Sequence, residues 1–179
     1  ADTVHVVGDS GIILNYDYAT FEERPVGLNA TWFHDIWGFS DSSIFVVGRY
    51  GRILHYNGDR WSKSRLTGGD TTQTTTELLS VWGTSPENVY IVGGSGAVLH
   101  LSLTDSDTSL TVVNVRTGYN LWGVWGLSES SIYVVGDGGL VLHYDGNDWS
   151  RMETPVSVAL AGIWGTAEDN LYAAGAGGT

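Results

Sequence analysis

Apolar residues along this chain follow one short pattern that returns five times. In each copy a short apolar run ends at a glycine, a brief turn follows, and a second apolar run begins. The copies are VHVVGDSGIILNY (4–16), IFVVGRYGRILHY (44–56), VYIVGGSGAVLHL (89–101), IYVVGDGGLVLHY (132–144) and the shorter LYAAGAGGT (171–179). The glycines that end the first run lie 40, 45, 43 and 39 residues apart: Gly8, Gly48, Gly93, Gly136 and Gly175. A period in this range is typical of a solenoid, a propeller or a repeat array.

Each full repeat predicts four short strands. The first strand ends in Ile or Val followed by Trp-Gly, and it recurs at 32–38, 78–83, 121–126 and 160–165. The second strand is the apolar run, whose continuous apolar character indicates burial on both faces. A Gly-x-x-Gly turn, in which glycine supplies a positive φ at low steric cost, leads into the third strand. The fourth strand begins at an aromatic residue: Phe21, Trp61 or Trp149.

The third copy departs from this scheme. The polar segment 102–109, SLTDSDTS, replaces the turn before the fourth strand, which is predicted at 110–115. Ahead of that copy lies a Thr-rich, low-complexity segment at 67–77, TGGDTTQTTTE, which is too polar to bury. We expect this segment to be a surface loop leading into the next first strand.

A repeated four-strand unit with Trp and Gly at fixed offsets predicts an all-β propeller of four-stranded antiparallel blades. We expect one domain over 1–179 with about four to five blades: partial blades at 1–29 and 159–179, and complete blades at 31–75, 76–118 and 119–158. The two ends of the sequence do not combine into one complete blade. If the first strand from 159–179 completed the partial blade at 1–29, the apolar run at 171–174 would duplicate the run at 4–7. Two interpretations stay open: part of a larger ring, or a ring completed by a second copy as a homo-oligomer.

The repeat reads Trp-Gly-x-Ser, then Tyr-Val-Val-Gly-x-x-Gly, then Leu-His-Tyr-Asp-Gly-x-x-Trp in its fullest form, at 125–149. It resembles a bacterial β-propeller repeat family and is similar to photosystem-assembly-factor and neuraminidase-type (Asp-box) propellers. The match covers nearly the whole chain. Segment 144–149, YDGNDW, has the Asp, Gly and Trp of an Asp-box without its Ser or its spacing, so sialidase chemistry is not carried over. The resemblance implies a propeller fold and a secreted, periplasmic or cell-surface location.

Charge and composition narrow the range of partners. The sequence has 20 Asp and Glu against 8 Lys and Arg, a net charge of −12 at pH 7. A nucleic-acid binder needs a basic stripe to neutralise phosphates, and the sequence shows none. We also expect no membrane insertion, because no apolar run approaches the length of a membrane span. Cysteine is absent, which excludes disulfides and thiolate chemistry. A first residue of Ala1 fits either a removed leader or a fragment.

No catalytic, metal or cofactor site is expected. His55, His100 and His143 occupy one repeat position, and equivalent positions on successive blades lie on the order of 10 Å apart. Ligands of a zinc ion lie about 2 Å from it, so these histidines are expected to be structural, hydrogen-bonded residues. The acidic residues concentrate in turns, which explains them without catalysis. A glycosidase, which needs two carboxylates about 5–9.5 Å apart, is the least favoured alternative.

Candidate binding residues are expected on one rim of the ring. In a propeller the first strand of each blade is innermost, and the loops leading into it share a rim with the turns between the second and third strands. Tryptophans at repeated positions are predicted to pack in the core: 37, 82, 125 and 164. Trp32 and Trp122 break the repeat, and Tyr50 lies in a turn. The predicted ligand contacts are Trp32, Trp122, Tyr50, Asp9, Arg49 and Asp137.

We therefore expect a non-enzymatic, exported scaffold that binds a protein or a glycan at this rim. A carbohydrate-binding propeller is the first alternative, and it should leave Trp32, Trp122 or Tyr50 exposed beside polar groups. A structural piece of a larger surface protein or filament is the second alternative. The sequence does not specify the ligand.

Overall fold

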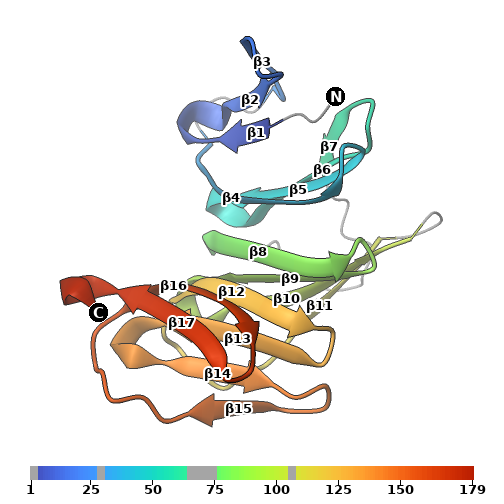
Figure 1. Ribbon diagram of the computed structural model, residues 1–179. Coiled ribbons are helices and arrows are strands. Elements are labelled where there is room, and N and C mark those ends of the chain that lie inside the picture. The colour runs from blue at the N-terminus through green and yellow to red at the C-terminus, as the bar shows by residue number, and fades with distance from the viewer. Residues whose placement is uncertain (1–3, 28–30, 64–75, 105–107) are drawn as a thin grey trace.

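The computed structural model describes residues 4–27, 31–63, 76–104 and 108–179. Over these residues the chain forms five antiparallel sheets that follow one another in chain order (Figure 1). We number the sheets blades 1 to 5. Blades 2, 3 and 4 each have four strands in consecutive order, which confirms the predicted all-β architecture of four-stranded antiparallel blades. Among the described residues, no helix is long and apolar enough to cross a membrane.

The strand bounds are as follows. Blade 1 has β1 (Val4–Val7), β2 (Ile13–Tyr16) and β3 (Phe21–Glu23). Blade 2 has β4 (Phe33–Ser40), β5 (Ser43–Gly48), β6 (Arg52–Tyr56) and β7 (Trp61–Lys63). Blade 3 has β8 (Leu78–Ser85), β9 (Asn88–Gly93), β10 (Val98–Leu103) and β11 (Thr108–Val112). Blade 4 has β12 (Leu121–Ser128), β13 (Ser131–Gly136), β14 (Val141–Tyr144) and β15 (Trp149–Met152), and blade 5 has β16 (Leu160–Ala167) and β17 (Asn170–Gly175).

The prediction for the third copy was wrong in register. β10 continues to Leu103 and β11 begins at Thr108, so Ser102 and Ser109 are paired residues of the sheet and not turn residues. The fourth strand lies at Thr108–Val112 instead of 110–115. Pairing of Leu101 with Leu110 accounts for the shift, since an apolar cross-strand pair fixes which residues share a face. Of the predicted loop at 67–77, only residues 76 and 77 lie inside the described residues.

The Gly-x-x-Gly turns use their two glycines for different reasons. The second glycine has a φ between 65° and 81° in all five copies, as predicted. The first glycine is extended, with a φ of −175° at Gly48. A Cβ atom at Gly48 would lie 2.1 Å from the carbonyl oxygen of Trp32. The close passage of the chain that leads into β4 therefore excludes a side chain at Gly48.

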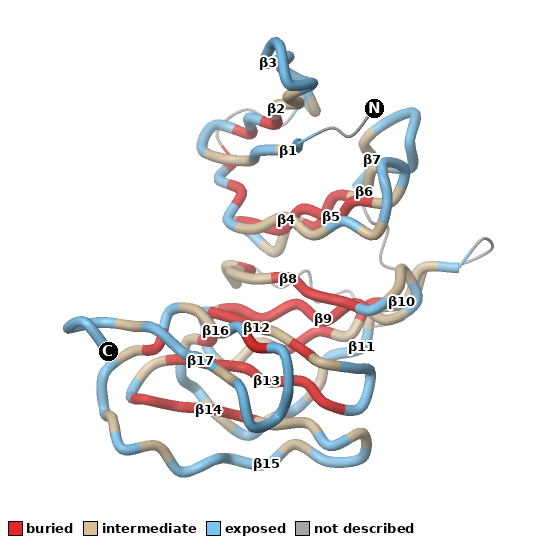
Figure 2. The backbone as a smooth tube through the Cα atoms, viewed as in Figure 1, coloured by how far each residue is buried: buried red, intermediate tan, exposed pale blue. Residues whose placement is uncertain are grey.

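The core lies between neighbouring blades. In β5, Phe45 and Val47 pack with blade 3, whereas Val46 packs with Ile13 of blade 1. Both faces of the second strand are thus buried in blades 2 to 4, as predicted. Burial in Figure 2 concentrates in blades 2 to 4, whereas residues of β1 and β17 are largely exposed or only partly buried.

The three repeated histidines are structural, as predicted. Each imidazole lies against the ring of an aromatic residue on the second strand, with centroids 4.4–4.6 Å apart: Phe45–His55, Tyr90–His100 and Tyr133–His143. Each Nε2 atom also lies within 2.8–3.5 Å of a side-chain oxygen at the start of that strand: Ser43, Asn88 and Ser131. Burial lowers the pKa of His55 and of His100.

The repeated Trp-Gly pair joins each blade to the next. The indole N–H of Trp37 donates to the carbonyl oxygen of Gly83 at 3.1 Å. In blade 3, Trp82 packs over Gly126, where a Cβ atom would lie 2.3 Å from the ring. The tryptophan of one blade thus packs against the glycine in the first strand of the next blade.

One tryptophan departs from the predicted core packing. Trp164 is 52% exposed, whereas Trp82 is 4% exposed. Trp125 donates its indole N–H to Gly165 of blade 5 at 3.0 Å, whereas among the described residues no strand packs over Trp164 in the same way. The prediction of burial failed at this position because the covering surface belongs to a neighbouring repeat.

Candidate functional site

The predicted rim exists. The turn between the second and third strands hydrogen-bonds to the chain just ahead of the first strand of its own blade: Arg49 N to Trp32 O, Gly94 N to Glu77 O, and Asp137 N to Asn120 O, at 2.9–3.0 Å. A second set of bonds runs to the next blade, as from Gly51 N to Thr76 O at 2.9 Å. The turns and the described residues just ahead of the first strands therefore share one edge, joined by backbone hydrogen bonds.

The first cluster on this rim joins blades 2 and 3. Trp32 is 42% exposed, and the guanidinium carbon of Arg49 lies 4.3 Å from the centroid of its ring. Arg49 Nε also donates to Glu77 Oε1 at 2.7 Å, and this bond raises the pKa of Arg49 above its usual value. Arg49 is held between an aromatic face and a carboxylate, so it fixes the orientation of Trp32.

Tyr50 stands beside this cluster in a costly backbone conformation. Its φ is 61° and 60% of its surface is exposed. The same turn position carries glycine in blades 4 and 5. A left-handed conformation in a bulky residue stores strain of about 1–3 kcal/mol, and such strain concentrates at functional sites. This exposed aromatic side chain is therefore retained at the expense of local stability.

The second cluster lies on blade 4. The indole N–H of Trp122 donates to Asp137 Oδ1 at 2.7 Å, and the backbone N–H of Asn120 donates to Asp137 Oδ2 at 3.2 Å. Trp122 remains 38% exposed. Asn120 Oδ1 in turn accepts a hydrogen bond from the backbone N–H of Ser95 in the turn of blade 3. Trp122 is therefore held in one orientation by a carboxylate that is itself anchored to the backbone.

Tyr119 is a rim aromatic that the sequence analysis missed. It is 48% exposed, and a Cβ atom on Gly138 would lie 3.7 Å from its ring. It therefore flanks the same turn as Asp137. The signal available in the sequence was an aromatic residue outside the repeat frame, two residues before a first strand.

All six predicted contacts lie on this rim, in separate groups. Asp9 is an exposed residue in the turn of blade 1 and contributes electrostatically to the raised pKa of Arg49. The structure places Trp32, Arg49 and Tyr50 together and Trp122 with Asp137. The turn of blade 3 lies between the two groups. In the part of the chain that the structure describes, no group of three or more acidic or histidine side chains could hold a metal ion.

Known structures with the same arrangement are propellers. YCF48 from Cyanidioschyzon merolae matches 96% of this chain and 60% of its own length, with a TM-score of 0.70 and 11% identity. A structure of YCF48 bound to D1 peptide matches 97% and 56%, with a TM-score of 0.68 and 15% identity. The β-propeller domain of Cps50 (Swd1) from Myceliophteria thermophila matches 98% and 59%, with a TM-score of 0.72 and 8% identity.

The chain has a β-propeller fold. It spans about 56–60% of the length of these structures. No protein-family model matches the sequence. No curated protein matches it either. The resemblance is therefore established for the propeller architecture, while the particular repeat family stays a prediction.

Proposed function

We propose that the chain is a non-enzymatic interaction scaffold whose rim binds an extended segment of a protein partner. The observation that carries the proposal is the gathering of exposed, oriented aromatic residues on one edge: Trp32, Tyr50, Tyr119 and Trp122. Aromatic residues are enriched among the energetically dominant contacts of protein interfaces. They supply a large contact area and lose few rotatable bonds on binding.

Preorganisation strengthens the case. Arg49 and Asp137 hold Trp32 and Trp122 before any ligand arrives. Binding then costs less side-chain entropy than it would if these indoles had to be ordered. The YCF48 structure with a bound D1 peptide shows that a propeller of this fold holds a peptide, which supports an extended peptide as the ligand class here.

Charge favours a neutral or basic partner. The chain has a net charge of −12, so its field attracts cationic segments and repels acidic ones. Asp9, exposed in the turn of blade 1, offers a carboxylate on this rim. A segment with Arg or Lys near apolar residues would satisfy both the carboxylates and the aromatic faces.

A glycan is the second candidate ligand. Trp32 and Trp122 are exposed beside charged groups, as expected for a surface on which sugars stack. A glycosidase is disfavoured, because two rim carboxylates are already engaged by other side chains. Glu77 is engaged by Arg49 and Asp137 by Trp122.

We also propose that the protein is exported, as the resemblance of its repeat implies.

Selection from a displayed peptide library against the 179-residue chain tests the proposal. We expect enriched peptides whose affinity falls about tenfold or more in Trp122→Ala and in Arg49→Ala, as for dominant interface contacts. Arg151→Ala is the matched control, because Arg151 is an exposed arginine on the outer strand β15. Peptides that bind the rim variants as well as the parent would contradict the proposal. A glycan array on the same variants identifies a sugar ligand if Trp122 is required there and no peptide is enriched.

A further inference from the structure

Each first strand carries one extra residue near its start. The pairing of the first strand with the second shifts at the same repeat position in blades 2 to 5, which marks a β-bulge. A bulge re-aims the side chain of its extra residue, and bulges are over-represented next to active sites. The extra residues are His34, Leu79, Trp122 and Ala161. Trp122 therefore breaks the repeat by its side chain, whereas its position is common to four blades.

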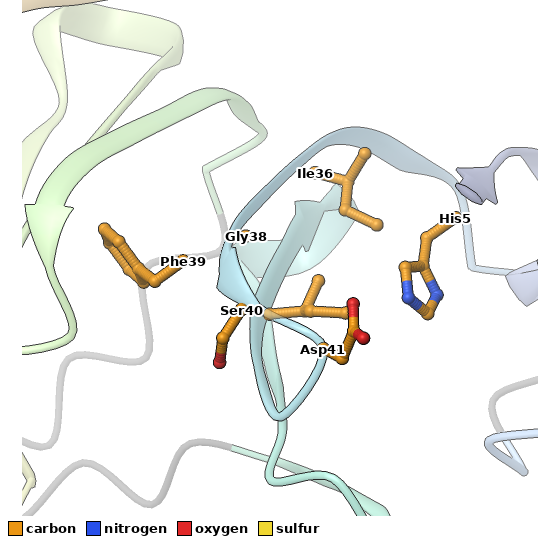
Figure 3. Close-up of a pocket in the computed structure, with 7 residues that line it drawn as sticks. His5, Ile36, Gly38, Phe39, Ser40 and Asp41 are labelled. Carbon is orange, nitrogen blue, oxygen red and sulfur yellow. The ribbon is translucent and has the colours of Figure 1, made fainter. Parts of the chain in front are cut away.

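The bulged residue lies outside the two packed faces of its strand. Figure 3 shows these faces for β4, in which Ile36 points toward His5 of blade 1 and Phe39 points away from it. Ile36 packs in the core shared with blade 1, whereas Phe39 packs in the core shared with blade 3. In β12, Leu121 is buried in the core shared with blade 3, while the next residue, Trp122, is exposed.

The bulged side chains of the four blades gather along one edge. Each first strand is the edge strand of its sheet. The strands β4, β8, β12 and β16 contact one another in this order, so their free edges lie side by side. We call the four bulged residues on these edges the axial row. Within it, Leu79 is half-buried and Trp122 is exposed, although β8 and β12 each have a first strand on both sides.

Hydrogen bonds between the first strands hold the axial row in line. The carboxylate oxygen Oδ2 of Asp35 accepts a bond from the backbone N–H of Val81 at 2.9 Å and one from the hydroxyl of Ser80 at 2.8 Å. Ser80 Oγ in turn accepts a bond from the backbone N–H of Val124 at 3.4 Å. Asp35 and Ser80 each directly follow a bulged residue, so these bonds set the bulges of blades 2, 3 and 4 beside one another.

Asp35 adds a negative charge to this surface. Three hydrogen bonds reach its carboxylate, which has about four acceptor sites, so one site is left. Among the described residues no Lys or Arg forms a salt bridge with Asp35, and the four first strands contain neither residue type. The surface therefore offers a carboxylate on blade 2 and apolar side chains on blades 3 to 5.

On the basis of the proposed function, we propose that Asp35 and the axial row bind the extended partner segment through one cationic and one apolar side chain, two or three residues apart. The cationic side chain, Lys or Arg, lies beside Asp35. The apolar side chain packs on Leu79 and Trp122. An extended chain advances about 3.3 Å per residue, so two or three residues span about 7–10 Å, roughly the step from one blade to the next. The order of charge and apolar residue along the blades thus fixes the register of the segment.

Displayed libraries with a fixed Lys and a fixed Trp at a series of separations, in otherwise random sequence, test the proposal against the whole 179-residue chain. We expect enrichment to concentrate where the two residues stand two or three positions apart. The affinity of an enriched peptide should fall about tenfold or more in Asp35→Asn and in Leu79→Ala. Asp41→Asn, at an exposed aspartate at the far end of β4, and Leu127→Ala, at a half-buried leucine of β12, are the matched controls.

A change in the peptide tests the charge contact without altering the fold. Replacement of the peptide Lys by Gln should weaken binding to the parent chain about tenfold or more and have little effect on binding to Asp35→Asn, because the two changes remove the same contact. Fully additive losses would overturn the pairing with Asp35. Equal enrichment at every separation, or no enrichment at all, would overturn the proposed register.

The variants also separate this site from the rim proposal. A peptide that needs Arg49 and Trp122 but binds Leu79→Ala and Asp35→Asn as tightly as the parent would overturn the axial site and leave the proposed function standing. The unconstrained peptide selection described above decides the proposed function by itself, so the two proposals fail distinguishably.

Discussion

The indole N–H of Trp37 lies 3.1 Å from the carbonyl oxygen of Gly83, and this bond links blade 2 to blade 3 across 46 residues of chain. The same relationship recurs between Trp125 and Gly165 at 3.0 Å. Each of these two tryptophans thus donates its indole N–H to the blade that follows its own. A tryptophan is buried only where a successor is present, which makes the contribution of this motif to stability position-dependent.

Alanine substitution at two repeat-equivalent tryptophans tests this dependence. Trp82 is 4% exposed and packs over Gly126, so Trp82→Ala should lower the free energy of unfolding by about 3–5 kcal/mol. Trp164 is 52% exposed, so Trp164→Ala should cost about 1 kcal/mol or less. Urea unfolding of both variants gives the comparison. Equal losses would show that the contact between blades is not what stabilises these residues.

Two glycines of the first strands should respond differently to alanine. A Cβ atom on Gly126 would lie 2.3 Å from the Trp82 ring, whereas nothing lies within 4 Å of one on Gly162. Gly126→Ala should therefore destabilise the fold by about 1–3 kcal/mol through overpacking. Gly162→Ala should stay within about 0.5 kcal/mol of the parent. Thermal and urea unfolding measure both, and a neutral Gly126→Ala would contradict the seating of Trp82 on this glycine.

Acid should weaken the fold through two of the repeated histidines. Burial lowers the pKa of His55 and of His100 below the unfolded value of about 6.5. The unfolded chain then binds more protons than the folded chain between the two pKa values, so stability falls as the pH drops through this window.

Replacement by asparagine, the residue that blade 1 carries as Asn15, removes both titrating groups. The free energy of unfolding of His55→Asn/His100→Asn should lose less between pH 7 and pH 5 than that of the parent. His34→Asn, at an exposed position, is the control and should follow the parent. Parallel profiles for the double variant and the parent would count against the two histidines as the origin of the acid sensitivity.

Replacement of Tyr50 by glycine should raise the stability of the fold and weaken binding at the rim. The φ of 61° at Tyr50 suits glycine, which blades 4 and 5 carry at this turn position. Tyr50→Gly should therefore raise the free energy of unfolding by up to about 1 kcal/mol through relief of strain. The affinity for a rim-selected peptide should fall in the same variant. Calorimetry and binding on one sample test both effects, and a variant that binds normally would remove Tyr50 from the site.

The propeller was predictable because its evidence is periodic. Gly8, Gly48 and their equivalents occur once in each blade. The histidine at the position of His55 packs against an aromatic ring in each of the three blades that carry it. The failures came from relationships between repeats. Trp164 is exposed because no described strand packs over its face, and the pairing of Leu101 with Leu110 depends on strand register.

The site was only partly predictable for the same reason. Trp32 and Trp122 stood out because they break the repeat. Arg49 stacks on Trp32 and hydrogen-bonds to Glu77 ahead of the next blade. These contacts could not be predicted, because they depend on distances between side chains that are far apart in the sequence. Tyr119 could not be predicted as a binding residue, because it lies in a loop outside the repeated strand pattern.

The most direct measurement of the central claim is the indole N–H spectrum of the chain, recorded by NMR with and without a rim-selected peptide. The sequence has 8 tryptophans, and each gives its own indole signal. Trp32 and Trp122 are exposed on the rim, while Trp61 and Trp149 lie on outer strands. The account predicts that the peptide shifts the signals of Trp32 and Trp122 and leaves those of Trp61 and Trp149 unmoved. Shifts confined to the outer-strand signals would contradict a binding rim.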